Sequence, residues 1–122
     1  MEEIELGIPA PIVDSLPEDG TDARQDIQRA VEGWEKDINA VLDTDDPAAG
    51  VVDLIEYFED RWEAYDGFVV ELRAWGQSPI YAMVWRDLVA SVIQQIYDHG
   101  GLADRISRER NARIVDDGIR PG

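Results

Sequence analysis

Apolar residues recur at alternating intervals of four and three positions in two segments of the chain. The first segment carries Ile27, Val31, Trp34, Ile38 and Val41, and the second carries Val51, Ile55, Phe58, Trp62 and Tyr65. Residues at these intervals share one face of an α-helix. The pattern therefore predicts two amphipathic helices, over residues 21–42 and 47–66, with a turn at 43–46 between them.

Start and stop signals flank both predicted helices. Thr21 is a good N-cap, and Asp46 followed by Pro47 is a typical helix start. The pair Asp66-Gly67 predicts the end of the second helix, because glycine commonly follows a helix C-terminus.

A third helix is predicted over residues 79–98, between Ser78-Pro79 and the glycines at 100 and 101. Its apolar residues surround most of its circumference, which is typical of a buried helix. We therefore expect the first two helices to pack against it. The four tryptophans fall on predicted apolar faces, so we interpret them as core residues rather than as platforms that stack on bases or sugars; they are Trp34, Trp62, Trp75 and Trp85.

The stretch 68–75 fits two patterns. Phe68, Val70, Leu72 and Ala74 would form one face of a strand, whereas Phe68, Val69, Leu72 and Trp75 would form a helical stripe. Since the chain has too few other strand candidates to build a sheet, we favour a short helix.

Two flanking segments complete the organisation. In the arm 1–20, Ile4, Leu6 and Ile8 alternate with polar residues, and the prolines at 9, 11 and 17 favour an extended path. Ile12, Val13 and Leu16 are also apolar, so the arm should lie on its own domain or on a neighbour. Residues 102–115 predict a last helix with a weak stripe of Leu102, Ile106 and Ile114, followed by an extended tail over 116–122.

The predicted fold is all-α. It is a small bundle of three main helices and one or two short helices, with extended arms at both ends. By this division residues 1–20 are the N-terminal arm, 21–101 the helical core domain, and 102–122 the arginine-rich C-terminal helix and tail. A chain of 122 residues is long enough to bury a core of its own.

All of the net charge lies in the first half of the chain. Residues 1–66 hold 20 of the 27 acidic and 4 of the 11 basic residues, and the formal charge of the whole chain is −16. Such acidity disfavours binding to nucleic acid. Ten of the bases are arginine and only Lys36 is lysine, a surface composition typical of proteins in concentrated salt. We therefore expect a halophilic, archaeal source or its virus.

The location follows from what the sequence lacks. It has no cysteine, so no disulfide or thiolate metal site forms. Its first residues are acidic, unlike a signal peptide. The most apolar stretch is interrupted by Arg86, Asp87, Gln94 and Gln95, which are costly in lipid. We expect a cytoplasmic or virion protein that is neither secreted nor membrane-bound.

Two carboxylate pairs are the best enzyme candidate. Glu32-x-x-Glu35 and Glu56-x-x-Glu59 lie on successive predicted helices, and residues three apart share a helix face, where carboxylates could hold Mg²⁺. The arrangement resembles the MazG-like all-α nucleoside triphosphate pyrophosphohydrolases, whose pattern has Asp where this chain has Glu59. The resemblance implies a Mg²⁺-dependent hydrolase. In so acidic a chain the spacing also arises by chance, and we favour a solvated face.

No other catalytic pattern is present. The single histidine, His99, precedes Gly100 at a predicted helix end, where it suits the helix dipole. One histidine and no cysteine leave no nucleophile–base pair. We therefore expect neither catalysis nor a cofactor.

The C-terminal arginines are the main interaction candidates, and they are Arg105, Arg108, Arg110, Arg113 and Arg120. Guanidinium groups pair well with carboxylates, so copies of the chain could dock head to tail. The alternative is local pairing with Asp104 and Glu109. With Ile4, Leu6 and Ile8 of the arm, these residues predict a non-catalytic, homo-oligomeric assembly subunit, which could form a ring within a larger assembly. Its plan is similar to that of viral head–tail connector subunits. A regulatory adaptor that binds another protein is the alternative.

Overall fold

Five α-helices make up the part of the chain that the computed structural model describes, which is residues 2–17, 19 and 21–118, the last three for their backbone only. They are α1 (Ala10–Asp14), α2 (Thr21–Leu42), α3 (Pro47–Ala74), α4 (Ile80–Asp98) and α5 (Leu102–Gly118). No strand occurs among these residues, so the all-α prediction is confirmed.

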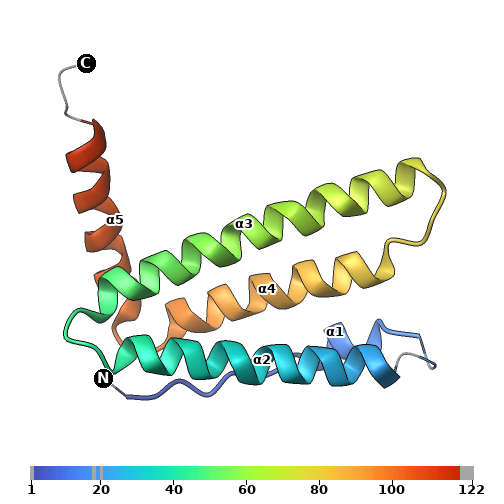
Figure 1. Ribbon diagram of the computed structural model, residues 1–122, viewed down its shortest axis with the longest axis horizontal. Coiled ribbons are helices and arrows are strands. Elements are labelled where there is room, and N and C mark those ends of the chain that lie inside the picture. Colours follow the sequence, from blue (N-terminus) through green and yellow to red (C-terminus); the bar gives the residue numbers. More distant parts are fainter. Residues whose placement is uncertain (1, 18, 20, 119–122) are drawn as a thin grey trace.

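The three long helices α2, α3 and α4 lie side by side, and each runs antiparallel to the one before it (Figure 1). α4 supplies much of the core, with Ala82, Val84, Leu88, Val89, Val92 and Ile96 buried. α3 packs on it through Phe58 and Ile55, and α2 packs on it through Val31. The expected central role of this helix is confirmed.

α3 is longer than predicted, because Gly67 does not end it and the expected short helix over 68–75 is its continuation. A glycine within a helix costs only about 1 kcal/mol. That cost is offset where the helix goes on to bury Val69, which is 1% exposed. The helix ends instead before Gly76, whose φ of +71° suits glycine.

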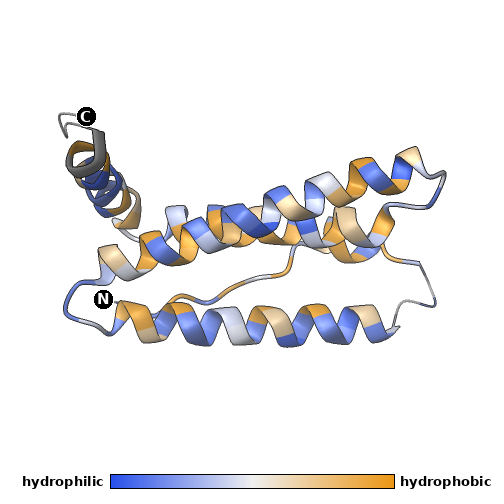
Figure 2. Cartoon of the chain, turned by 45° about the horizontal axis from the view of Figure 1, so that its top comes forward, coloured by the Kyte–Doolittle hydropathy of each residue, from blue (hydrophilic) through white to orange (hydrophobic). Residues whose placement is uncertain are grey.

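The prediction that the prolines keep the whole N-terminal arm extended was wrong for residues 10–14, which form α1. Pro9 is the N-cap and Pro11 lies in the first turn. A proline costs nothing there, because the first N–H groups of a helix have no partner within it. Residues 2–9 are extended and run between α2 and α4, as the hydropathy view shows (Figure 2).

Both flanking segments contribute to the core. Ile4 and Leu16 are 5% and 6% exposed, and Leu102 and Ile106 are fully buried. The expected extended tail was also wrong for residues 116–118, which continue α5. The helix carries on because nothing before Gly118 breaks it, while residues 119–122 lie outside the described part of the chain.

Only two of the four tryptophans meet the expectation of core positions. Trp34 and Trp85 pack against the core, and their rings lie edge to face with centroids 6.4 Å apart. Trp62 and Trp75 are 36% and 66% exposed. Within the described ranges, none of the helices has both the length and the apolar character needed to cross a bilayer.

Candidate functional site

α5 leaves the bundle at the end where the chain turns back from α4. Its first turns are anchored by Leu102 and Ile106, both fully buried in the main core cluster. Its last turn stands away from the other helices (Figure 1). There Ile114 and Val115 are 66% and 53% exposed. The predicted stripe is therefore confirmed for its first two members and wrong for Ile114, because no other helix extends that far.

Two of the candidate arginines hold α5 to α3. Arg110 Nη2 donates to Glu59 Oε1. Arg113 Nη1 lies 2.9 Å from Asp53 Oδ1 and 3.6 Å from Glu56 Oε1, and its Nη2 donates to the Ala49 carbonyl at 3.1 Å. These groups come from the first half of α3, so the ion pairs fix where α5 crosses it.

Within α5, Arg113 Nε also donates to Glu109 Oε1 at 3.2 Å. The local pairing considered from the sequence thus occurs for Glu109. The contacts with α3 could not be predicted, because they depend on how α5 crosses that helix.

The carboxylates raise the pKa of both arginines. For Arg110, burial is the largest effect and lowers the pKa, but the hydrogen bond to Glu59 and the nearby negative charges together outweigh it, so the net shift is upward. For Arg113, the hydrogen bonds with Asp53 and Glu109 raise the pKa. Both guanidinium groups therefore stay charged. Arg110 Nε is buried and has no hydrogen-bond partner among the described residues, so this arginine is held from one end only.

The opposite face of α5 is open. Arg105 and Arg108 are exposed, and Ala112 and Val115 continue the same stripe at intervals of four and three. The described residues supply no ion pair to Arg105 or Arg108. The predicted cluster thus divides into an inner face, with Arg110 and Arg113, and an outer face, with Arg105 and Arg108. Arg120 lies outside the described residues.

The carboxylate pairs are used in contacts within the chain. Glu35 accepts a hydrogen bond from the Leu6 amide, and Glu32 accepts one from Gln28. Glu56 and Glu59 face the arginines of α5. The described residues contain no group of three or more carboxylates or histidines that could hold a metal ion. The structure therefore does not bring the two pairs together.

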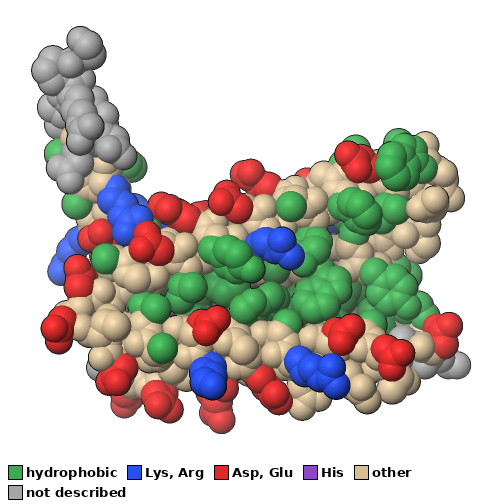
Figure 3. Space-filling model, in the orientation of Figure 1, with side chains coloured by type: hydrophobic (Ala, Val, Ile, Leu, Met, Phe, Trp, Pro, Cys, Tyr) green, Lys and Arg blue, Asp and Glu red, His purple; other side chains and the backbone are tan. Residues whose placement is uncertain are grey.

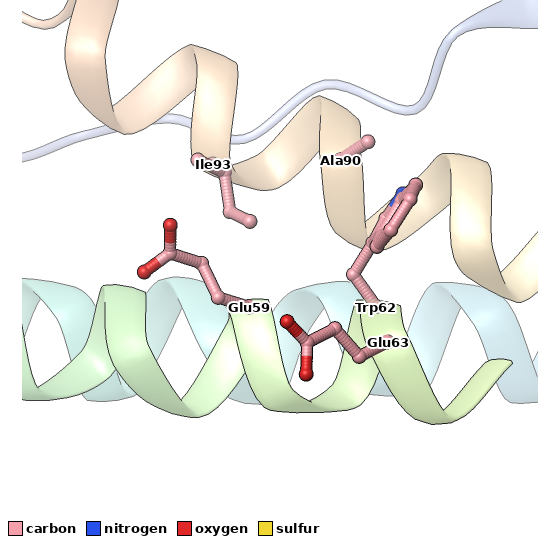
Figure 4. A pocket seen from close by; sticks show the side chains of 5 residues that line it. All are labelled: Glu59, Trp62, Glu63, Ala90 and Ile93. Carbon is pink, nitrogen blue, oxygen red and sulfur yellow. The ribbon is translucent and has the colours of Figure 1, made fainter. Parts of the chain in front are cut away.

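A hollow of about 300 Å³ opens between α3 and α4 beside these contacts. Its apolar part is made by Trp62, Ala90 and Ile93, and its acidic side chains are Glu59 and Glu63 (Figure 4). Trp62 reaches from α3 towards Ala90 on α4, and both carboxylates lie on the α3 side. An apolar wall next to carboxylates suits a cation with a hydrocarbon stem, such as an arginine or lysine side chain.

An apolar band runs between α2 and α3, and acidic side chains line the outer side of α2 (Figure 3). Part of the band is a hollow of about 280 Å³ lined by Trp34, Asp37, Leu54, Tyr57 and Phe58. Tyr57 is 50% exposed there. The spacing of apolar residues predicts the buried face of α3. It does not show that an exposed aromatic residue, Tyr57, lies beside that face.

The α3–α4 turn exposes a further apolar group, made up of Phe68, Val70, Trp75 and Tyr81. The stretch 68–75 fits both a strand and a helix pattern because its apolar residues lie on several faces. A helix with apolar residues on several faces cannot bury all of them against one neighbour. A single ion pair, Arg86 to Asp66 at 2.9 Å, joins α4 to α3 near this end of the molecule in the described chain. The hydrogen bond to Asp66 raises the pKa of Arg86.

The arm residues Ile4, Leu6 and Ile8 lie against the molecule's own core. The sequence left open whether the arm lies on its own domain or on a neighbour, and in the structure it lies on its own domain. The groups that hold the arm were missed: they are Asn39 and Gln95, which bond its backbone, and His99. His99 Nε2 lies 2.9 Å from the Glu2 carbonyl oxygen, so this side chain contacts the arm as well as the end of α4.

Comparison with known families gives one match. A family model described as a family of unknown function, DUF7971, matches residues 1–122. The chain belongs to this family. No curated protein and no solved structure matches the chain. For this DUF7971 member, a function must therefore be argued from its own surfaces.

Proposed function

We propose that this protein is a non-catalytic assembly subunit, and that the outer face of α5 docks on another copy of the chain. The observation that carries the proposal is the division of the arginines on α5. Arg110 and Arg113 are paired with α3, whereas Arg105 and Arg108 face outward beside exposed apolar side chains. A helix that stands off its bundle with such a face is suited to contact a partner.

The other half of the contact would be the acidic surface of the neighbouring copy. The hollow at Glu63 and Trp62 offers what an arginine side chain needs. The hydrocarbon stem would pack on the indole ring and on Ile93, and the guanidinium would meet the carboxylate. Glu59 is already paired with Arg110, so Glu63 is the acceptor that we assign to the partner.

A contact between two different surfaces is heterologous. It closes into a ring if the rotation between copies allows it and otherwise makes a filament. We propose the ring, in the manner of a head–tail connector subunit in a halophilic host or its virus. The multi-molar salt of such a host would screen the repulsion between subunits that each carry a charge of −16.

Light scattering in dilute buffer and in multi-molar KCl tests the proposal. We expect a discrete large oligomer in KCl, and its loss, down to a dimer or a monomer, for the double variant Arg105→Glu with Arg108→Glu. The matched control is Arg29→Glu with Lys36→Glu, which makes the same change in charge at two exposed sites on α2 and should keep the oligomer.

Charge exchange tests the assigned acceptor. Glu63→Arg alone should also lose the large oligomer, and an equimolar mixture with the Arg105→Glu, Arg108→Glu variant should recover it as mixed oligomers. A wild-type protein that is monomeric at every salt concentration would overturn self-assembly. Oligomers larger than a dimer that survive both reversals would overturn the docking surfaces.

A further inference from the structure

The N-terminal arm is bound by side-chain amides in the way that one β-strand binds another. Asn39 Oδ1 accepts from the Ile4 amide at 2.7 Å, and its Nδ2 donates to the Ile4 carbonyl at 3.1 Å. Gln95 repeats this at Gly7, with Oε1 accepting at 2.7 Å and Nε2 donating at 2.9 Å. Each amide side chain thus pairs with both backbone groups of one residue.

The contacts between these two pairs continue the pattern. Glu35 Oε1 accepts from the Leu6 amide at 2.7 Å. Ile4 is buried in the core, and Leu6 and Ile8 pack against it from alternate positions. Backbone hydrogen bonds with pockets for every second side chain are how proteins recognise extended peptides. The groove between α2 and α4 is therefore a peptide site, which is filled here from the same chain.

The distal part of the arm is held loosely. α1 has no buried residue. Ile12 packs partly buried against the core, but a hollow of about 480 Å³ opens beside it between α1 and α4, with Met83 also on its wall. Of the residues described between α1 and α2, Leu16 is the buried one. The arm therefore has a strong binding segment at residues 4–7 and a weak attachment where it joins the bundle.

We propose that the groove between α2 and α4 also takes the arm of a second copy, so that copies are joined by exchange of their N-terminal arms. An exchanged arm would make the same contacts with the groove as the arm of the same chain. For this reason exchange of an identical element is a low-cost route to oligomers. An arm that left without replacement would expose the core around Ile4, so the second copy's arm is the occupant that restores the fold.

The arm's own charge assists its release. Glu2, Glu3 and Glu5 lie along α2, where Glu35 is also acidic. Salt screens their mutual repulsion. Exchange between copies should therefore be fast in dilute buffer and slow in concentrated KCl.

Because the chain has no cysteine, single cysteines can report exchange by cross-linking. Gly7→Cys and Ser91→Cys place thiols on the arm and on the groove. Gln95 Nε2 contacts both the Gly7 carbonyl and Ser91 Oγ, at 2.9 and 3.1 Å, so a short bismaleimide spans the two sites. A Cβ at Gly7 meets only Gln95 Oε1, at an ordinary 3.8 Å, so the arm can remain bound.

The two single variants are mixed in dilute buffer, brought to multi-molar KCl and treated with the bismaleimide. Arm exchange predicts a cross-linked dimer of one copy of each variant. Ser91→Cys mixed with Gly33→Cys, which adds a thiol at an exposed site on α2, controls for random collision. The protein that carries both Gly7→Cys and Ser91→Cys shows that the fold is intact, since an arm bound in its own groove cross-links within one chain.

A mixture that yields no dimer, while the double variant cross-links only within single chains, would overturn arm exchange. The same mixture in the Arg105→Glu, Arg108→Glu background separates this inference from the docking of α5. If docking fails and exchange is correct, the cross-linked dimer still forms.

Discussion

At the scale of single residues, Gly50 is where α2 and α3 approach most closely among the described glycines. A Cβ built at Gly50 would lie 2.5 Å from Val41 Cγ1. Valine is restricted at χ1, so it cannot turn away freely. We expect Gly50→Ala to destabilise the fold by about 1–3 kcal/mol, as overpacking does.

Gly67→Ala is the matched control, because nothing lies within 4 Å of a Cβ there and the residue is in the middle of α3. It should stabilise the protein by about 0.5–1 kcal/mol, the helix-propensity difference between alanine and glycine. Urea unfolding of both variants measures the contrast. Equal effects at the two glycines would contradict the close approach.

Asn39 and Gln95 give a second prediction at this scale. Truncation of Asn39 leaves the half-buried Ile4 N–H without its partner, which costs about 1–3 kcal/mol, whereas water can replace Gln95 at the exposed Gly7 N–H, so that loss should be about 0.5–1.5 kcal/mol. Gln94→Ala is the control, because Gln94 is exposed and contacts only Asp98. We expect Asn39→Ala and Gln95→Ala to lower stability in urea unfolding and to speed amide exchange at residues 4–7. If Gln94→Ala has the same effect, the hydrogen bonds of Asn39 and Gln95 are not what holds the arm.

At the scale of elements, α5 joins two different environments within one helix. Ile106 is fully buried and Ile114 is 66% exposed. Ile106→Ala should cost about 2–5 kcal/mol, because it leaves a cavity in the core. Ile114→Ala should change the stability of the monomer by less than about 0.5 kcal/mol. Thermal unfolding at low protein concentration makes the comparison, and a large loss at Ile114 would show that the C-terminal half of α5 is packed in the monomer.

The helices themselves could be predicted from spacing alone, because Ile27, Val31 and Ile38 recur with the period of a helix whatever surrounds them. The boundaries at Gly67 and Pro11 could not. A glycine or a proline has a local cost, and whether the chain accepts it depends on packing that is distant in sequence, such as the burial of Val69.

At the scale of the whole molecule, charge decides the conditions under which the fold is stable. Folding gathers a net charge of −16 into one small body, and most of it lies on the arm, α2 and the first half of α3. The Debye length falls from about 10 Å at 0.1 M salt to about 3 Å at 1 M. We expect the unfolding temperature to rise steadily as KCl increases from dilute to multi-molar.

A variant with Asp26→Asn, Glu32→Gln and Asp37→Asn on α2 serves as the control for that experiment. These side chains are exposed, so their removal should cost little packing. The rise in unfolding temperature with KCl should be smaller in this variant. An unchanged rise would assign the salt effect to something other than repulsion between carboxylates.

The candidate site was predictable in composition but not in arrangement. The arginine cluster at 105–113 was visible in the sequence, and its division into two faces was not. Arg110 and Arg113 meet Glu59 and Asp53 only because Leu102 and Ile106 fix the angle at which α5 leaves the core. The hydrogen bonds between the arm and the side chains of Asn39 and Gln95 could not be predicted for the same reason, since these residues lie far from Ile4 and Gly7 along the chain.

The distance between Gly7 and Gln95, 88 positions along the chain, has a consequence for biosynthesis. A ribosome delivers the arm first, yet one wall of its groove emerges only when α4 has been translated. Until then the apolar side chains of residues 4–8 have no complete place to bind. The arm is therefore made long before its groove is complete, and in that interval its apolar side chains can meet the groove of a copy that has already folded.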